Sequence, residues 1–459
     1  MKQIRKVPRL KSLNFYEAMW LAMPVLVWFS YYPNIHFGQD STMNFEISLS
    51  LIGLLVLAVA SLPSVWRKQH ELVKNKLVWA VSGLVLYSST TMLWSVNPTR
   101  SFLTVGIMVL LFTVFLGAVA QKDRLVKLLP AITKVFVISA AVMSVLAIVQ
   151  FALGIWLTQE ATLLCSGCVS QQFGFPRPNV MAIEPQFLGN LLLAPILVVA
   201  QRFLTGRTGR WEVMALAVML LAMFLTMSRG AIYALALGMI ILLIANRKQF
   251  KRIGSIAGVA LVTFVVSLLL QGGAAAASPV VSESFWGGVS KSINQMTLGI
   301  VDIRKAAPPA EAGVEVAEKE LPAFDGYVEE STEVRANRTE LALEAWRKDL
   351  STTVFGVGVG GAGVAMHQSS PEEIGAREIV QNEYVERLLE RGLIGLILST
   401  SVIGLIIYKL RHTKWLWAIV AAFLLQWSLF SGYPNALHIY LVLILTCVVA
   451  LSKKPLRNS

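Results

Sequence analysis

Apolar segments of roughly twenty residues, separated by short polar connections, fill most of this chain. A helix needs ~20 predominantly apolar residues to cross a bilayer, so each segment predicts one membrane-spanning helix. Their approximate bounds are 15–33, 45–66, 77–94, 101–120, 131–157, 180–204, 211–228, 229–246, 253–271, 392–408, 415–431 and 436–452. We therefore expect an all-α integral membrane protein with about twelve transmembrane helices.

One boundary within this pattern needs an argument of its own. Residues 211–246 are almost continuously apolar and are interrupted only at Ser228-Arg229-Gly230. As a single helix this stretch would be ~54 Å long, which exceeds the thickness of a bilayer. We expect two helices that are joined by a tight turn at the Ser-Arg-Gly sequence.

A single long polar segment, residues 272–391, interrupts the pattern of spans. Its first part, 272–333, is rich in Ala, Gly, Pro and Glu, and we expect it to be partly disordered because this composition buries little apolar surface. Two amphipathic helices are predicted after it, over 334–350 and over 377–391, and the second leads into the tenth span.

The predicted loop helices differ in what their side chains indicate. Leu341, Ala345 and Trp346 fall near one face of the first helix, which predicts a buried face. Arg347, Glu386 and Arg391 are expected on solvated faces, because charges on an exposed helix usually face water.

The chain is 55% hydrophobic and only 15% charged, as multi-span membrane proteins are. A net charge of +13 would suit a nucleic acid, but Lys and Arg gather in every second connection, as the positive-inside rule requires of cytoplasmic loops. The other short connections hold only Arg100, Arg177 and Arg229. We expect no nucleic-acid partner, and we assign both termini to the cytoplasm. The predicted organisation is nine transmembrane helices over 1–271, an extracytoplasmic loop over 272–391 and three transmembrane helices over 392–459.

Cys165 and Cys168 form a Cys-x-x-Cys pair on the predicted outer side. Two ligands without a nearby histidine make a poor zinc site, so a local disulfide is the better expectation. The five histidines are scattered along the chain, and we expect no metal site.

Arg229 is the first candidate for chemistry, because it stands between two apolar spans. A charge at this depth is costly unless it meets a partner or a water-filled cavity. An arginine beside the N-terminus of the following helix would suit a diphosphate. The competing interpretation is an arginine that only reaches out to the membrane interface.

Arg177 and Glu184 form a second candidate pair at the sixth predicted span. Arg177 lies at its outer end, and Glu184 is expected about two helical turns deeper, where Pro185 would open the helix. Asn179 and Gln186 add polar groups to this segment. A carboxylate inside a span favours a functional role, although an ion pair that only holds helices together is the competing interpretation.

These residues occur in a fixed order over about residues 173–400: Arg177 with Glu184-Pro185, then Ser228-Arg229-Gly230, then a glycine-rich stretch over 355–363 and a polar helix. The series resembles the bacterial O-antigen ligase and O-antigen polymerase superfamily. At the end of the loop the resemblance rests on Asn382, Tyr384, Glu390, Gly392 and Gly395.

The resemblance implies a metal-independent, inverting glycosyltransferase of the bacterial cytoplasmic membrane, without a cofactor. Such an enzyme moves a glycan from an undecaprenyl-diphosphate carrier to an acceptor at the outer face. Arg177 and Arg229 would bind the diphosphate with help from Arg335, because guanidinium groups match phosphate oxygens. The expected partners are an undecaprenyl-diphosphate-linked oligosaccharide, a glycan acceptor, the lipid bilayer and a chain-length regulator.

One position departs from the family. Ligases of the family carry a histidine before the asparagine, where it is thought to activate the acceptor hydroxyl, and here that position is Gln381, which cannot take up a proton. We therefore expect Glu184 to act as the base, with His367 as the second candidate. The Glu-Pro setting resembles polymerase-type members, which favours a repeat-unit polymerase.

Three alternatives remain open at this stage. An O-antigen ligase or a protein O-oligosaccharyltransferase would use the same chemistry with a different acceptor. A transporter would show inverted repeats with paired broken helices, and the sequence contains no convincing internal repeat. A structural assembly subunit would tolerate the loss of Arg229.

Overall fold

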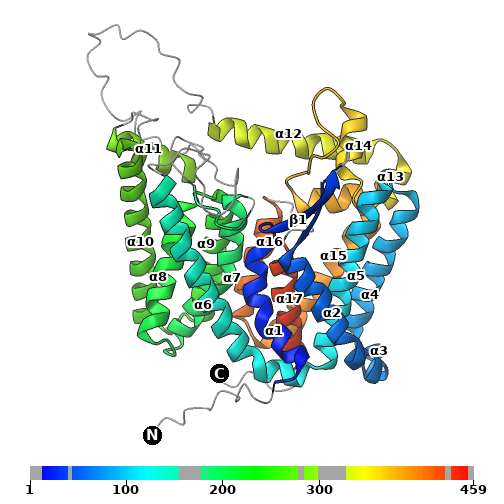
Figure 1. The fold of residues 1–459 in the computed structure, drawn as a ribbon, viewed down its shortest axis with the longest axis horizontal. Coiled ribbons are helices and arrows are strands. Elements are labelled where there is room, and N and C mark those ends of the chain that lie inside the picture. The colour runs from blue at the N-terminus through cyan, green and yellow to red at the C-terminus, as the bar shows by residue number, and fades with distance from the viewer. Residues whose placement is uncertain are drawn as a thin grey trace. The chain divides into compact units, whose positions relative to one another are not determined.

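The computed structural model describes residues 13–39, 44–154, 177–182, 184–277, 284–297, 327–429 and 436–452. These residues are almost entirely helical (Figure 1). The expected disulfide between Cys165 and Cys168 lies outside the described residues, as does the segment 298–326. The chain divides into two compact units, each with its own set of packed helices.

The first unit comprises residues 1–139, 240–245 and 338–459. Its main helices are α1 (Phe15–Leu26), α2 (Leu49–Arg67), α3 (Gln69–Val73), α4 (Lys76–Thr90), α5 (Pro98–Ala120), α13 (Leu350–Phe355), α14 (Ala362–Ser369), α15 (Glu383–Lys409), α16 (Leu416–Trp427) and α17 (Leu437–Leu451). Within this unit α2 packs against α5, and Gly117 permits this because a Cβ there would come within 2.4 Å of Ser61.

The second unit comprises residues 140–239 and 246–337. Its helices are α7 (Pro185–Leu204), α8 (Arg210–Leu225), α9 (Arg229–Ala245), which ends in the first unit, α10 (Phe250–Ala277) and α11 (Phe285–Met296). The long helices α6 (Lys122–Gly154) and α12 (Tyr327–Arg347) each contribute residues to both units. A buried apolar cluster around Leu225, Met227 and Ala274 joins α8 and α10.

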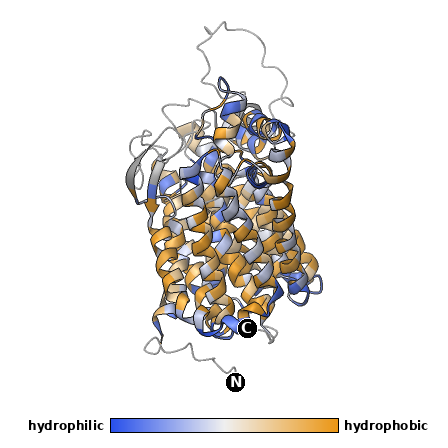
Figure 2. Ribbon diagram, turned by 90° about the vertical axis from the view of Figure 1, so that its right-hand side faces the viewer, coloured by the Kyte–Doolittle hydropathy of each residue, from blue (hydrophilic) through white to orange (hydrophobic). Residues whose placement is uncertain are grey.

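Each of the twelve predicted apolar segments overlaps one of these helices. Among the residues that the structure describes, seven helices are long and apolar enough to cross a membrane, and hydrophobic residues cover the helices along most of their length (Figure 2). The chain is therefore an all-α, multi-pass membrane protein. The predicted turn between residues 211–228 and 229–246 is confirmed, because α8 ends at Leu225 and α9 begins at Arg229.

The second predicted span is wrong at its start. Residues 45–48 belong to β2 (Asn44–Ser48), which pairs antiparallel with β1 (Asn34–Gln39) in a short hairpin that the sequence pattern did not predict. The Ser48 hydroxyl accepts a hydrogen bond from the Leu51 backbone N–H at 3.3 Å, so it caps α2 and fixes the start of that helix.

The polar segment is more helical than its composition indicates. α10 continues to Ala277, and α11 lies within the stretch that was expected to be partly disordered. The first predicted loop helix corresponds to α12, and Leu341 and Ala345 on its predicted apolar face are buried in a cluster with α14.

The second predicted loop helix, 377–391, begins six residues later than expected. The Asn382 side chain accepts hydrogen bonds from the backbone N–H groups of Tyr384 and Val385, at 3.1 and 3.2 Å, and so caps α15 at Glu383. α15 then bends at Gly392, whose φ of 61° and ψ of −168° are not helical, before it continues to Lys409.

Candidate functional site

The turn between α8 and α9 brings two predicted arginines to one place in the second unit. Arg229 is the first residue of α9, and Arg177 donates a hydrogen bond from Nε to the carbonyl oxygen of Thr226 at 2.8 Å. Both side chains are buried, with only 7% and 8% of their surface exposed. Burial strengthens their attraction for an anion, because the local dielectric constant is lower than in water.

The turn itself is held by local hydrogen bonds. The Thr226 hydroxyl accepts from the Ser228 N–H at 3.2 Å and donates to the Met223 carbonyl at 2.6 Å. Met227 adopts a left-handed backbone with φ of 50°, which lets the chain reverse within three residues. This geometry places Arg229 at the positive end of the α9 dipole.

The segment that carries Arg177 is fixed by an amide network. Gln150 on α6 accepts hydrogen bonds from the backbone N–H groups of Asn179 and Val180, at 3.0 and 2.8 Å, and donates to the Asn179 side-chain oxygen at 2.9 Å. Asn179 in turn donates to the carbonyl of Ala182 at 2.9 Å. Asn179, predicted only as a nearby polar group, therefore positions the backbone two residues after Arg177.

The N-terminus of α7 lies against the same turn. A Cβ on Gly189 would be 2.5 Å from the Cβ of Ala231 and within 3.7 Å of the Thr226 hydroxyl, so α7 and α9 meet closely at their first turns. Gln186 is buried in the first turn of α7, and its side-chain oxygen accepts a hydrogen bond from Arg335 at 3.0 Å. Two helix N-termini and three arginines thus converge in one unit.

Glu184 does not lie where the sequence placed it. It is the N-cap residue of α7, outside the helix, and it is exposed, so the prediction of a carboxylate two turns inside a span is wrong. The reason is Pro185, which takes the first helical position, where its missing N–H costs nothing and its fixed φ suits the helix. The Glu184 side chain makes no capping hydrogen bond and lies at the edge of the site.

Two more polar groups lie at this site, of which Asn190 was not predicted and Ser228 was predicted only as part of the turn. Asn190, one turn after Gln186 on α7, is fully buried, and neither atom of its side-chain amide has a hydrogen-bond partner among the described residues. The Ser228 hydroxyl is also buried without a partner in this part of the chain. Such groups are costly, and in native proteins each requires a reason, such as a bound ligand or a catalytic role. The spacing of four residues between Gln186 and Asn190 was the available signal.

In the first unit, the glycine-rich stretch is a loop that packs against the end of α4, the start of α5 and the part of α15 before its bend. Val357 donates to the Leu389 carbonyl at 2.9 Å, Gly358 donates to the Glu390 carbonyl at 3.0 Å, and Val359 donates to the Thr91 hydroxyl at 3.1 Å. Gly358 has φ of 93°, and a Cβ there would come within 2.4 Å of Ser95. The loop needs glycine because other backbones approach it this closely.

Glu390, on α15, stabilises this loop through a hydrogen bond. Its carboxylate accepts a hydrogen bond from the Gly360 N–H at 2.7 Å and lies in a small cavity whose lining includes Arg100, Thr104 and Arg391. Its predicted role as an acceptor-side residue stays a prediction, and its observed contacts are those of a positioning group.

A buried ion pair lies along the same helix. The Nε of Arg387 is 2.8 Å from a carboxylate oxygen of Glu383, and the guanidinium also donates to the Tyr440 hydroxyl at 3.1 Å and lies 4.4 Å from the centre of the Trp427 ring. Tyr384, on the same turn, donates from its hydroxyl to the carbonyl of Leu424 at 2.8 Å. These contacts join α15 to α16 and α17.

The prediction that Glu386 and Arg391 face solvent is wrong, since both side chains are buried, whereas Arg347 is exposed as expected. The physical reason is that the glycine-rich loop and α5 cover this face of α15. The charges buried there are of opposite sign and compensate one another. His367 donates from Nδ1 to the carbonyl of Ile374 at 2.7 Å, a contact that holds the loop after α14.

Gln381, at the family's histidine position, is partly exposed and adopts φ of 63°. Within the described parts of the chain, no three His, Cys, Asp or Glu side chains form a set that could hold a metal ion.

Comparison with known proteins identifies the domain that contains most of these residues. Residues 214–400 match the sequence model of the family described as O-antigen ligase, a stretch that runs from α8 into α15. It contains Arg229, Arg335 and the Gln381–Gly395 segment, while Arg177 and Glu184 precede it. No curated protein matches the chain. Residues 214–400 therefore form an O-antigen ligase domain, which relates this part of the chain to the O-antigen ligase and polymerase superfamily.

Proposed function

We propose that this protein transfers a glycan from an undecaprenyl-diphosphate carrier and polymerises the repeat units of a surface polysaccharide. The observation that carries the proposal is the pair of buried arginines, Arg177 and Arg229, at the α8–α9 turn. In this proposal the enzyme is an inverting glycosyltransferase that works without a metal ion, at the outer face of the bacterial cytoplasmic membrane.

The arginines would act on the leaving group. When the glycosidic bond to the carrier breaks, negative charge develops on the diphosphate, and fixed cations in a buried site stabilise that charge. Arg177 is preorganised because its Nε is held by the Thr226 carbonyl, which fixes the orientation of the guanidinium plane before a ligand arrives. The N-termini of α7 and α9 add backbone donors of the same polarity.

Arg335 would close the site from the loop side. It lies on α12 and is hydrogen-bonded to Gln186 in the first turn of α7. This contact ties the extramembrane helix to the diphosphate-binding end of the second unit, so Arg335 would both bind the diphosphate and hold α12 in place.

Glu184 remains the proposed base for the acceptor hydroxyl. Its carboxylate is exposed beside the α7 N-terminus and is not used to cap the helix. The deep, buried setting that first suggested this role does not exist, so the proposal now rests on its position two residues before Gln186, the partner of Arg335. In the first unit, Gln381, Asn382, Tyr384 and Glu390 would form the acceptor side.

The ligase alternative is favoured by the description of the matching family. The polymerase is favoured by Gln381, because a residue that cannot take up a proton replaces the histidine that the ligases carry. We propose a topology of twelve spans with cytoplasmic termini for either case, supported by the overlap of every predicted segment with a helix and by the distribution of basic residues.

The test uses the purified protein with a lipid-linked oligosaccharide as the sole glycan. Formation of longer lipid-linked chains supports a polymerase, whereas product formation only after a second acceptor is added identifies a ligase.

Changing Arg229 to Lys should lower the rate at least about 100-fold, because Lys cannot reproduce the forked contact with a diphosphate. The matched control is Arg210→Lys, an exposed arginine at the start of α8. Unchanged polymer formation by the Arg229 variant would contradict the proposal.

A further inference from the structure

A second charged pocket lies in the first unit, at the other end of α5 from the glycine-rich loop. Ser101, near the start of α5, donates a hydrogen bond to the Val359 carbonyl, whereas Ala120 at its end lines the pocket. About twenty residues of helix separate these positions by ~30 Å, which is the thickness of the hydrocarbon core of a bilayer. The two sites therefore lie at opposite membrane faces, and the pocket belongs to the face that the basic residues assign to the cytoplasm.

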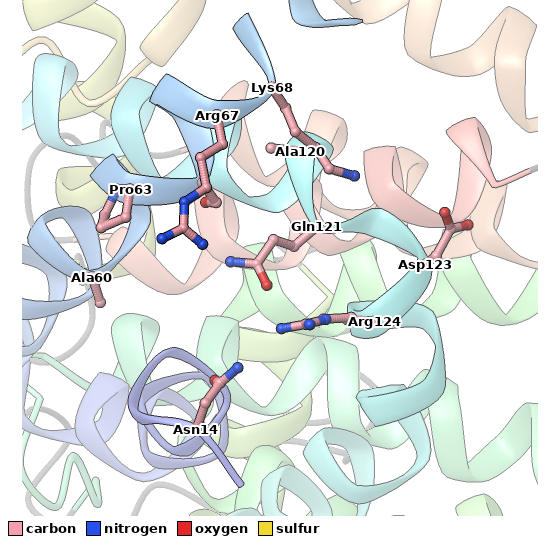
Figure 3. Close-up of a pocket in the computed structure, with 10 residues that line it drawn as sticks. Asn14, Ala60, Pro63, Arg67, Lys68, Ala120, Gln121, Asp123 and Arg124 are labelled. Atoms are coloured by element: carbon pink, nitrogen blue, oxygen red, sulfur yellow. The ribbon is translucent and has the colours of Figure 1, made fainter.

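The pocket gathers basic side chains around an open space. Arg67 and Lys68 come from the end of α2, and Arg124 comes from the first turn of α6. The side chains of Arg67, Gln121 and Arg124 point into the same space, with Asn14 on its far side (Figure 3). These three basic residues outweigh Asp123, the acidic residue of the lining, so the pocket attracts anions.

The pocket is lined by α2 and α5 next to a close contact between these two helices. Gly117 and Ser61 pack tightly, and the chain of α2 then passes Pro63, which lines the pocket and cannot donate a backbone hydrogen bond. The side-chain oxygen of Gln121 is buried here and accepts no hydrogen bond from the described residues. A polar ligand that also carries a donor would satisfy it.

The outer surface of α2 beside the pocket is strongly apolar. Val59, Leu62 and Trp66 are exposed by 57%, 52% and 78%, and they form a stripe next to the pocket-lining residues Ala60 and Pro63. Trp at the level of basic residues is typical of the membrane interface. An acyl chain could follow this stripe while the headgroup stays at the arginines.

We propose that this pocket binds the phosphate ester of an anionic phospholipid headgroup, with its acyl chains along Val59, Leu62 and Trp66. Arg67 and Arg124 hold the phosphate, and Asn14 and Gln121 bind the polar part of the headgroup. A basic pocket between transmembrane helices at the cytoplasmic face has the chemistry that anionic lipids need. The apolar stripe favours a lipid over a soluble phosphate compound.

The experiment is native mass spectrometry of the full-length protein, freed of lipid and titrated with phosphatidylglycerol or phosphatidylcholine. We expect a preference for phosphatidylglycerol that falls at least about tenfold when Arg67 and Arg124 are both changed to Gln. The control is Arg247→Gln with Lys248→Gln, which removes the same charge at exposed positions. An unchanged preference in the Arg67 and Arg124 variant overturns the proposal.

A second variant and a competition experiment with inorganic phosphate test the proposal independently of the arginine variant. Ala60→Trp fills the pocket without a change of charge and should cause the same loss, so the proposal is testable even if the arginine variant folds poorly. Inorganic phosphate should compete only weakly with the lipid. If inorganic phosphate instead binds strongly to the wild-type protein and displaces phosphatidylglycerol, the pocket binds a soluble phosphate compound. That result overturns the lipid assignment.

Discussion

At the scale of single residues, backbone strain marks the segments to which the proposed chemistry is assigned. Val180, Met227 and Gln381 are the non-glycine residues with positive φ in the described chain. Val180 follows Arg177, Met227 precedes Arg229, and Gln381 precedes Asn382. The family resemblance rests on the three segments that contain these residues. Left-handed backbone costs ~1–2 kcal/mol per residue outside glycine, so its presence at these places supports the proposed roles of the three segments.

Substitutions at Gln381 should report this strain. Val there should lower the free energy of unfolding by ~1–2 kcal/mol relative to Gly, because a β-branched side chain tolerates φ of 63° least. Thermal unfolding of the purified variants in detergent measures the difference. Equal stability of the Val and Gly variants would mean that the left-handed backbone is not adopted.

Asp349 gives a pH-dependent prediction outside the membrane. The backbone N–H and the hydroxyl of Thr352 donate to its carboxylate at 2.7 and 2.9 Å, and these hydrogen bonds lower the pKa of Asp349 below its usual value of 3.8. A lowered pKa means that the cap stabilises α13 above pH 3.8 and that this contribution is lost as the pH falls through the folded-state value. Hydrogen exchange of the α13 amides should therefore lose protection at acidic pH. Asp349→Asn keeps the cap without a titrating group, so its protection should lack this transition.

At the scale of elements, Gly392 joins the loop-side part of α15 to its membrane-side part. Its φ of 61° and ψ of −168° belong to a region that only glycine occupies readily, and a Cβ there would lie 2.2 Å from the Val354 carbonyl oxygen. Gly392→Ala should abolish folding or lower the unfolding temperature sharply.

Gly404 is the matched control on the same helix. A Cβ there meets nothing within 4 Å, so Gly404→Ala should stabilise α15 by up to ~1 kcal/mol through helix propensity. Expression level and thermal unfolding of the two variants provide the comparison, and similar behaviour of both would contradict the kink at Gly392.

Some features of these elements could be predicted from the sequence, and others could not. The apolar helices could be predicted because apolar runs of bilayer length are rare outside membrane helices, and the α8–α9 turn followed from length alone. Glu184 was misplaced because Pro185 can either break a helix or begin one, and the pattern cannot distinguish these cases. The burial of Glu386 and Arg391 depends on the glycine-rich loop that covers them, a contact distant in sequence. Asn190 was missed because a lone amide in an apolar run carries little signal.

At the scale of the whole molecule, the proposed function requires the glycine-rich loop of the first unit to face the outer side of the membrane. The first unit allows a direct test of orientation. The glycine-rich loop contacts Thr91 at one end of the α4 span, and α14 follows directly after it, whereas Lys74 precedes the other end. The span from Lys76 to Trp94 has 19 residues, or ~28 Å of helix, so Gln368 in α14 and Lys74 should lie on opposite sides of the bilayer.

Single cysteines at these two exposed positions, with Cys165 and Cys168 changed to Ser, make the orientation measurable. Cys447 can remain because it is buried. A membrane-impermeant maleimide should label Gln368→Cys in intact cells and Lys74→Cys only after the membrane is opened. The reverse pattern would invert the topology and place the glycine-rich loop in the cytoplasm, where a carrier presented at the outer face could not reach it. Labelling of both positions in intact cells would instead mean that α4 does not cross the membrane. Since the charge distribution and the helix lengths are independent of each other, agreement of the labelling with both would assign a membrane side to the glycine-rich loop and the acceptor-side residues of the first unit.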